Sequence, residues 1–427
     1  MPSNPKITYA YKGDPKWKPL AKHFIDFLGK HFDLSIKQVE SSPDFTIGTA
    51  DKVDLAITPT FRNLIEAKTF SHDHWFKKAP LLIHENFPDY LGTIMYMVNS
   101  VQEYFARDLD RYGRFKYESS YQFKFNCVSE DLVSEYFEKI RITLLSPWVP
   151  KKRQVKSKVF LSHDIDKVKA ATRTEMLHAF RSKNLSKIKS TAQKALQNSL
   201  GWNDFEGLAR FHQRRGYSTT FFWLTEFGDG EDGIYNADYK FSNDISKSTL
   251  EQIEAHKCFN ALHKSSSPNS LETDFQRLSH HIPANRNHYL KIQLPQFYRE
   301  LEASPIQFDS SLGLSQAMGF RNSYSKAFVP FDFDKQRPFH FVEYPLQIMD
   351  VSLCIHMYNS PNEAWPSIEQ FLEKHQYNAE LSILFHNQYL TKGVYADWLK
   401  LYHLIMDKLQ ELGIESTDPL KVIKSLL

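Results

Sequence analysis

The feature that most constrains the fold of this chain is a repeated alternation of strand and helix patterns that begins near residue 158. Short apolar runs rich in β-branched and aromatic residues predict strands at residues 159–162, 218–224, 258–262, 286–290, 306–309, 340–349 and 381–385. Helical periodicity predicts helices between them, at residues 205–215, 249–256, 271–281, 295–303, 362–375 and 395–412. Repeated strand–helix units favour an α/β fold with a parallel sheet, either open or closed into a barrel.

The first part of the chain shows mixed patterns without a catalytic constellation. We expect helices at residues 17–32 and 89–109 and a strand at 53–58. Residues 146–158 contain two prolines and five basic residues, a composition typical of a solvated linker. The sequence therefore predicts an N-terminal α/β accessory domain over residues 1–145, a linker over 146–158 and a second domain over 159–427.

Composition narrows the class of protein. The 53 basic and 50 acidic residues give a net charge of +3, too balanced to indicate a nucleic-acid partner. The three cysteines, Cys127, Cys258 and Cys354, lie far apart and form neither a disulfide framework nor a cysteine zinc site. No apolar run reaches the ~20 residues of a membrane span, and residues 1–9 lack a secretory apolar core. We expect a cytoplasmic protein without a transmembrane segment; the sequence leaves its oligomeric state open.

Two carboxylates follow the first strand of the second domain. Asp164 and Asp166 share one face because side chains alternate along a strand, and their mutual repulsion favours a cation between them or a shared proton. One could bind a divalent metal while the other acts as a base. The alternative is a helix cap by Asp166, which leaves Asp164 unexplained. In parallel folds functional groups gather at the carboxyl ends of strands, so we favour the functional interpretation.

Other strand ends also carry ionisable groups. His263 could present a ring nitrogen to a metal, and Arg286 could hold a catalytic carboxylate in place. His288 could be a metal ligand or a substrate contact, and His386 follows the last strand. The chain has 18 histidines, so an ordinary structural role is an open alternative for each of these. We expect supporting roles for Asp309 and Asp350 and substrate contacts from Tyr289 and Arg321.

An ordered set of motifs resembles a known family. The segments are Ser162–Asp166, Leu262–His263, Arg286–Leu290, Phe308–Gly313, Gly319–Arg321, Glu343–Leu346 with Met349–Asp350, and Phe385–Asn387. Together they resemble the polysaccharide deacetylases of carbohydrate esterase family 4, which have the NodB-like fold. The resemblance covers roughly residues 155–400 and is greatest to a bacterial branch with an HDxD first motif and an added N-terminal domain.

This resemblance implies a distorted (β/α) barrel with a divalent metal, usually zinc, at its mouth, and hydrolysis of an N- or O-linked acetyl group on a sugar. It assigns Asp164 as the catalytic base, Asp166 and His263 as metal ligands, Arg286 as the residue that orients the base, and His386 as the acid. The implied partner is an acetylated glycan or glycan precursor. The expected cytoplasmic location favours a precursor, such as a lipid- or nucleotide-linked sugar.

Two positions depart from the family pattern. Ile165 separates aspartates that are usually adjacent, although alternation still places both on one face. Ser267 stands where the second metal histidine should be, and serine is a poor zinc ligand. His288 could supply the third ligand, metal affinity could be weak, or activity could be lost. The alternative function is therefore a catalytically impaired barrel that binds glycans or acts as a scaffold. Hydrolysis of another amide by the same residues is also open.

Overall fold

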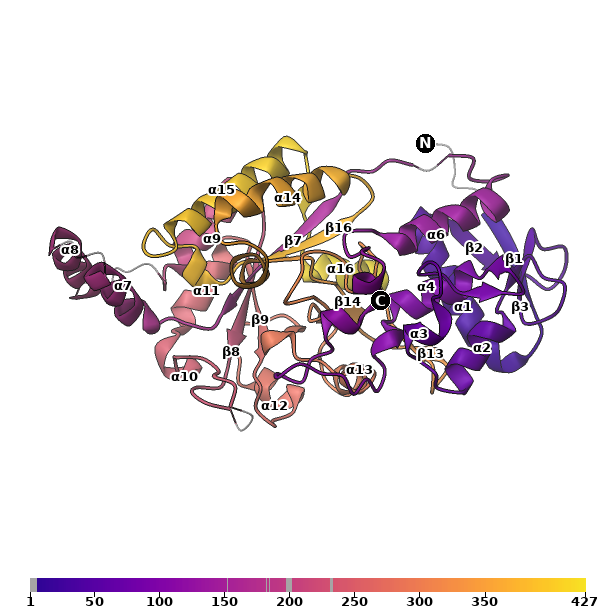
Figure 1. The fold of residues 1–427 in the computed structure, drawn as a ribbon, viewed down its shortest axis with the longest axis horizontal. Helices are drawn as coiled ribbons and strands as arrows, with labels where there is room; N and C mark the ends of the chain where they lie inside the picture. Colours follow the sequence, from indigo (N-terminus) through magenta and orange to yellow (C-terminus); the bar gives the residue numbers. More distant parts are fainter. Residues whose placement is uncertain (1–5, 152, 182, 184, 197–201, 231–232) are drawn as a thin grey trace.

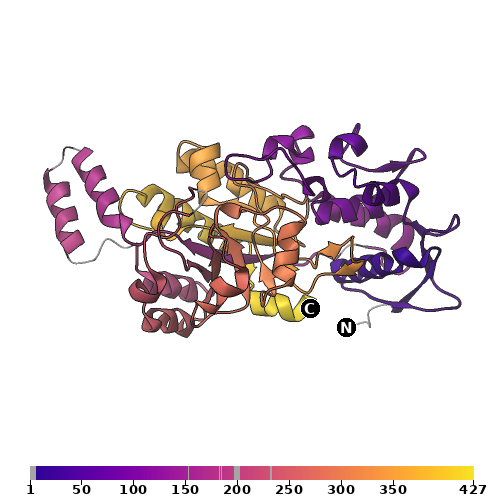
Figure 2. The ribbon, with the colours of Figure 1, turned by 90° about the horizontal axis from the view of Figure 1, so that it is seen from below.

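The structure is a computed structural model that describes residues 6–151, 153–181, 183, 185–196, 202–230 and 233–427. Its elements form an elongated molecule with the N-terminal part at one end and a larger α/β part in the middle (Figure 1). Helices α7 (Ala170–Arg181) and α8 (Leu185–Leu196) project from the opposite end in both views (Figures 1 and 2). Within these described ranges, no helix combines the length and apolar character that crossing a membrane requires.

The N-terminal part contains a four-stranded parallel sheet in the order β2-β1-β3-β4. Its strands are β1 (Lys6–Lys12), β2 (Ser35–Gln38), β3 (Phe45–Gly48) and β4 (Leu55–Ala56). The accompanying helices are α1 (Lys18–Phe32), α2 (Pro59–Glu66), α3 (His72–Trp75), α4 (Tyr90–Val98), α5 (Tyr121–Lys124) and α6 (Leu132–Ile140). A small hairpin pairs β5 (Ile83–His84) with β6 (Phe87–Pro88).

Two helices of the N-terminal part can be compared with the helices that the apolar periodicity predicted. Helix α1 agrees closely with the expected 17–32, and it ends where Asp33 adopts a left-handed backbone with φ of 57°. The helix expected at 89–109 is too long, because α4 ends at Val98. Ser100 and Phe105 both have positive φ angles, 49° and 56°, which a continuous helix does not permit. The residues after α4 form a short 3₁₀ turn and then a loop that reaches the second part of the molecule.

The second part is built on a nine-stranded parallel sheet in the order β14-β11-β10-β9-β8-β7-β16-β15, with β17 beside β7. The strands are β7 (Lys158–Ile165), β8 (Thr220–Leu224), β9 (Phe259–Lys264), β10 (Ala284–Asn287), β11 (Phe308–Asp309), β14 (Val342–Glu343), β15 (Ile348–Met349), β16 (Glu380–Leu384) and β17 (Glu415–Ser416). The sheet curls into a half-barrel, which is compatible with the distorted barrel that we expected.

Helices connect most of these strands. Besides α7 and α8 they are α9 (Phe205–Arg214), α10 (Phe241–Asp244), α11 (Lys247–Ala255), α12 (Leu271–Gln276), α13 (Gln296–Glu302), α14 (Pro361–Lys374), α15 (Ala396–Glu411) and α16 (Pro419–Leu426). Helix α9 shows how the sequence fixes a start: the Asp204 side chain accepts a hydrogen bond from the Gly207 amide at 2.9 Å. Strands β7 and β8 are buried on both faces, which explains their continuous apolar runs.

The strand expected at 340–349 is wrong as a single element. It is two short strands, β14 and β15, separated by residues 344–347. Pro345 lies in this gap and has no amide hydrogen for a ladder. The segment nevertheless joins the two edges of the sheet: Tyr344 donates its amide to Asp309 of β11, and Gln347 donates its amide to Ser382 of β16.

The hydrophobic core does not stop at the expected linker. One continuous cluster of buried residues begins at Ile7 in β1 and extends to Phe341, next to β14. Buried polar contacts accompany it: Gln122 donates from Nε2 to the Arg321 carbonyl, and Tyr121 donates to Ser323 at 3.0 Å. The two parts of the chain therefore pack as one body across this contact.

Candidate metal centre and active site

Four strands, β10, β9, β7 and β16, place ionisable side chains at one end of the curled sheet. Asp164 is the penultimate residue of β7 and Asp166 follows it, while His263 lies near the end of β9. His288 follows β10, and His386 follows β16. Because β10, β9, β7 and β16 are parallel, their carboxyl ends meet at the same edge. The structure thus brings together residues that are more than 200 positions apart in sequence.

Asp164 is held by a buried arginine. The Arg286 guanidinium donates from Nη1 to Asp164 Oδ1 at 2.9 Å and to Ser162 Oγ at 2.8 Å. Its other nitrogens donate to the backbone carbonyl and hydroxyl of Ser310, at 2.9 and 3.0 Å. The guanidinium also lies 4.5 Å from the centre of the Phe222 ring. Four of the five guanidinium N–H groups are therefore engaged, and Asp164 is held with its second oxygen, Oδ2, 3.6 Å from His263 Nε2.

Asp166, His263 and His288 form a group that could hold a metal ion, since one ligand atom from each lies within 4.8 Å of the others. His263 Nε2 is 3.4 Å from Asp166 Oδ1, and His288 Nε2 is 3.4 Å from Asp166 Oδ2. Bonds of ~2.1 Å at a tetrahedral angle give neighbouring zinc ligands a separation of roughly 3.4 Å. Two imidazoles with one carboxylate form a donor set found in catalytic zinc sites.

The hydrogen bonding of these side chains fits a bound cation. His263 donates from Nδ1 to the Arg286 carbonyl at 2.8 Å, so Nε2 carries the free lone pair when the ring is neutral. Within the described part of the chain, His263 Nε2 and Asp166 Oδ1 are buried without any hydrogen-bond partner. Buried polar atoms rarely remain unpaired, and a shared cation would satisfy both. The residues present therefore fit a divalent metal.

Charge also favours this interpretation. Burial acts to raise the pKa of the Asp166 carboxyl, but His288, His263 and His386 outweigh it and hold that pKa well below its ordinary value. Burial lowers the pKa of His288, and Asp166 only partly opposes this effect. An ionised carboxylate beside a neutral imidazole is the protonation state in which both groups bind metals.

His386 has a different environment from the other two histidines. Its Nδ1 lies 2.8 Å from Asp350 Oδ1, and its backbone amide also donates to the Asp350 carboxylate. Burial lowers the pKa of the imidazole, but Asp350 overrides this effect and the pKa rises to about 10. His386 Nε2 lies 3.5 Å from Asp166 Oδ2 and lines the same cavity. The ring therefore presents a proton on Nε2 toward the group.

Ser267 lies away from this group. Its hydroxyl is 2.8 Å from the Ser265 hydroxyl, and its carbonyl accepts a hydrogen bond from Lys264 at 3.0 Å. His288 instead fills the neighbouring position, with its ring centre 5.1 Å from that of His263. Of the alternatives that the sequence left open for the third ligand, the structure places His288 beside Asp166 and His263.

Two residues that we expected to contact substrate have different surroundings. Tyr289 lines the cavity next to His288. Arg321 does not line it: the guanidinium donates to both carboxylate oxygens of Glu103, at 3.0 and 2.6 Å, and to the Gly313 carbonyl at 2.9 Å. Arg321 therefore lies at the contact between the two parts of the chain, where its donors are taken up by protein groups.

The cavity at the strand ends has a volume of about 810 Å³ and contains Asp164, Asp166, His263, His288 and His386 in its lining. The N-terminal part supplies one wall, formed by Arg111, Tyr112 and Arg114. These residues follow no predicted strand and belong to the part without a catalytic pattern, so the sequence did not predict their place in the cavity. Their basic and aromatic character around Gly113 was the only available signal.

Comparisons with known proteins place the chain only coarsely. Residues 3–149 match a family of unknown function, DUF7033. A search of curated proteins finds no match. Among solved structures, a Mycobacterium smegmatis protein assigned as a polysaccharide deacetylase is 10% identical, with 64% of this chain and 91% of that chain covered and a TM-score of 0.36.

Two further structures are similar at the same level. A CE4 family pseudoenzyme from Bacillus anthracis is 11% identical, with 66% of this chain and 72% of that chain covered and a TM-score of 0.26. A 4-alpha-glucanotransferase from Thermococcus litoralis is 6% identical, with 64% and 41% covered and a TM-score of 0.37. At these identities and scores, none of these likenesses transfers an activity to this chain.

Proposed function

We propose that the protein is a metal-dependent hydrolase that removes an acetyl group, N- or O-linked, from a carbohydrate. The observation that carries this proposal is the arrangement of Asp166, His263 and His288 around one point, with Asp164 and His386 on either side. The motif resemblance to polysaccharide deacetylases supplies the substrate class. A divalent ion, zinc by that resemblance, would be held by Asp166, His263 and His288, and would polarise the acetyl carbonyl.

The proton transfers of the proposed reaction are assigned to side chains of the protein. Asp164, oriented by its hydrogen bond from Arg286, accepts a proton from the attacking water. The water oxygen bonds to the acetyl carbon while the bond from that carbon to the sugar nitrogen or oxygen breaks. His386 donates its Nε2 proton to the departing sugar atom, supported by the Asp350 carboxylate on the other side of the ring. The products are acetate and the deacetylated sugar.

Replacement of the proposed base tests this assignment. Asp164→Asn keeps the shape of the side chain and can still accept a hydrogen bond from Arg286, but it cannot take a proton from water. We expect turnover to fall by about 10²–10⁴-fold, the usual contribution of general acid–base catalysis. The measurement is acetate release from acetylated amino sugars and O-acetylated sugars by the zinc-loaded protein, with circular dichroism to verify the fold.

The matched control is Asp397→Asn, an exposed carboxylate on α15 that lies outside the cavity lining. It should retain full turnover. Undiminished acetate release by Asp164→Asn would contradict the assignment of the base. A wild-type protein that binds acetylated glycans but releases no acetate with zinc bound would instead identify a binding protein.

A further inference from the structure

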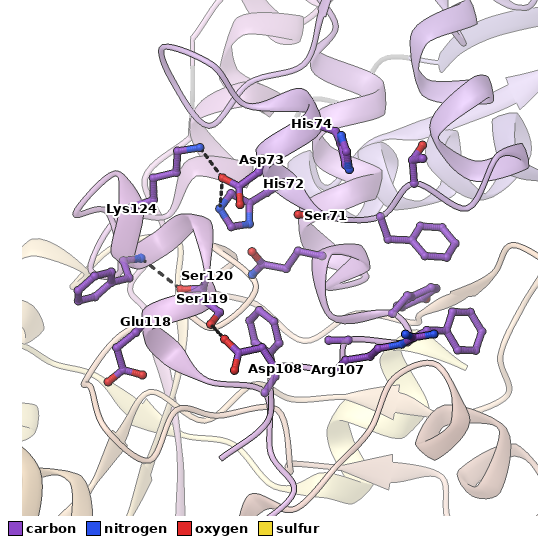
Figure 3. Close-up of a pocket in the computed structure, with 18 of the residues that line it drawn as sticks. Ser71, His72, Asp73, His74, Arg107, Asp108, Glu118, Ser119, Ser120 and Lys124 are labelled. Carbon is purple, nitrogen blue, oxygen red and sulfur yellow. Dashed lines mark hydrogen bonds and ion pairs between the residues drawn. The ribbon is translucent and has the colours of Figure 1, made fainter.

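The loop of residues 105–116 separates two cavities. Its first residues, including Arg107 and Asp108, line a cavity of about 820 Å³ within the N-terminal part. Figure 3 shows Asp73 of that cavity directed toward Lys124, and the two groups pair at 2.7 Å. Asp108 there accepts hydrogen bonds from Ser119 and Lys116. The later residues of the loop line the candidate metal cavity instead, and their charges are arranged differently.

A buried ion pair fixes the tip of this loop. Arg114 donates from Nε to Asp110 Oδ2 at 2.8 Å, and Asp110 also accepts the amides of Tyr112 and Arg114. Arg114 then donates from Nη1 to the Tyr289 carbonyl at 2.9 Å. The rings of Tyr112 and Tyr289 lie 4.9 Å apart. Since Tyr289 follows His288, the loop is anchored directly beside a proposed metal ligand.

Arg111 is the charged residue that this anchoring leaves available. Its guanidinium lies 4.6 Å from the centre of the Tyr112 ring and donates to the Tyr112 hydroxyl at 2.6 Å. The side chain is exposed and lines the metal cavity. Among the residues that the structure describes, no carboxylate pairs with it. A guanidinium held by an aromatic ring and free of counter-charge is preorganised to bind an anion.

The second part of the chain contributes two more cations to the lining of this cavity. Lys167, just after β7, and Arg173 on α7 line the same cavity with exposed side chains. Neither forms an ion pair with a carboxylate in the described ranges. Of the carboxylates that line the cavity, Asp164 pairs with Arg286, Asp166 belongs to the metal group, and Asp238 accepts the amides of Val168 and Ala170. Outside the proposed metal centre the lining thus holds Arg111, Lys167 and Arg173 with one carboxylate, Asp238, and has an excess of positive charge.

We propose that this cavity selects sugars that carry a negatively charged group, a phosphate or a carboxylate, and that Arg111 of the N-terminal part is a specificity residue for that group. The proposal rests on the proposed function for the position of the acetyl group. Arg111 and Arg173 bind the anionic oxygens, because a guanidinium matches the geometry of phosphate and carboxylate. Lys167 adds a third positive charge to the same cavity lining.

Calorimetry on the full-length, zinc-loaded protein tests the proposal. The probes are N-acetylglucosamine, N-acetylglucosamine 1-phosphate and an N-acetylated aminouronic acid. We expect at least one anionic sugar to bind about 10-fold or more tightly than the neutral sugar, consistent with charge-assisted hydrogen bonds at a partly exposed site. The preference should shrink as salt rises, because exposed charges are screened. The two anions distinguish phosphate from carboxylate as the favoured group.

Single substitutions test whether Arg111 produces the preference for anionic sugars. Arg111→Gln should reduce the preference for the anionic sugar by about 5–10-fold while binding of the neutral sugar changes little. Arg181→Gln is the matched control, an exposed arginine on the same helix as Arg173 but outside the cavity lining, and it should leave the preference unchanged. Equal binding of neutral and anionic sugars by the wild-type protein, or an unchanged preference in Arg111→Gln, would overturn the proposal.

Binding and turnover separate this proposal from the function it builds on. If anionic sugars bind in an Arg111-dependent way but no acetate is released, the selectivity stands and the hydrolase assignment fails. If acetate is released equally from neutral and anionic sugars with equal binding, the hydrolase assignment stands and the selectivity fails.

Discussion

At the scale of single residues, the structure places His288, which the sequence offered as a third metal ligand, beside Asp166 and His263. The sequence placed Asp166 and His263 at strand ends, but it could not decide between His288 and a weakened site without a third ligand. The choice depends on where β10 ends, because His288 lies one residue beyond it in a 3₁₀ turn. Strand boundaries of this kind follow from tertiary packing and not from local periodicity.

Removal of this histidine should therefore weaken metal binding. We expect His288→Ala to lower zinc affinity by more than about 100-fold, since even changes to groups behind metal ligands cost 10–100-fold. Titration calorimetry of chelator-treated protein with zinc measures the effect. Ser267→Ala is the control and should change affinity less than about 2-fold, because the Ser267 hydroxyl bonds only to Ser265. The opposite ranking of the two variants would show that the loop after β9 supplies the ligand.

A buried carboxyl pair away from the metal group gives a pH prediction. Asp309 of β11 and Glu343 of β14 lie side by side in register and are fully buried. Burial raises the pKa of Asp309 to about 6, and burial together with Asp309 raises the pKa of Glu343 well above its ordinary value. The folded protein thus holds a proton that the unfolded chain releases above about pH 4.5. Stability should therefore fall as pH rises above that value.

Glu343→Gln isolates this contribution. Glutamine can still accept the Leu312 amide and can donate to Asp309 without a titrating proton. The unfolding free energy of the variant minus that of the wild type should increase by on the order of 1–3 kcal/mol as the pH rises from 5 to 8. Urea denaturation at both pH values provides the comparison. A constant difference between variant and wild type across this range would show that the pair does not hold the extra proton.

At the scale of elements, the sequence predicted most helices and strands of the second part to within a few residues, because its apolar faces follow clear periods. It assigned no helix to α7, α8, α10 or α16, and it misplaced the ends of elements where the chain is irregular. Helix α12 ends at Gln276, well before the expected residue 281, and the expected strand at 340–349 is interrupted at Pro345. These segments are shaped by contacts with distant parts of the chain, which local patterns do not encode.

Gly319 makes one such contact with a distant part of the chain, and its replacement should destabilise the fold. Its φ is +138°, and a Cβ there would lie 2.3 Å from the Val128 carbonyl oxygen in the N-terminal part. That oxygen accepts the Phe320 amide at 2.7 Å, so a shift would disturb the hydrogen bond. We expect Gly319→Ala to lower the free energy of unfolding by about 2–4 kcal/mol, from backbone strain and the disturbed bond together. Urea denaturation measures it.

Gly216→Ala supplies the matched control. Its φ is +80°, but no atom lies within 4 Å of the added carbon. We expect Gly216→Ala to lower the free energy of unfolding by about 1 kcal/mol, because only the left-handed backbone conformation is unfavourable for alanine. Equal costs at the two positions would mean that the approach to Val128 is unimportant for stability.

At the scale of the whole molecule, the sequence indicated an α/β fold and the strand ends that carry chemistry, while the division of the chain at residues 146–158 stays a prediction. It did not indicate that the N-terminal part forms a wall of the cavity. That wall depends on contacts such as the one between Arg114 and Tyr289, which are 175 residues apart in sequence. Pairings at such separations leave no trace in composition or periodicity, so only the structure could reveal them.

The anchored loop at residues 105–116 has a consequence for how such a protein could diversify. The proposed metal ligands and the proposed base and acid all come from the second part of the chain, whereas Arg111 comes from the first. Substitutions at the tip could retune substrate choice while leaving the reaction chemistry intact, provided Asp110 and Arg114 remain to hold the backbone in place. The two parts can thus evolve at different rates, with selectivity drifting in one and reactivity constrained in the other.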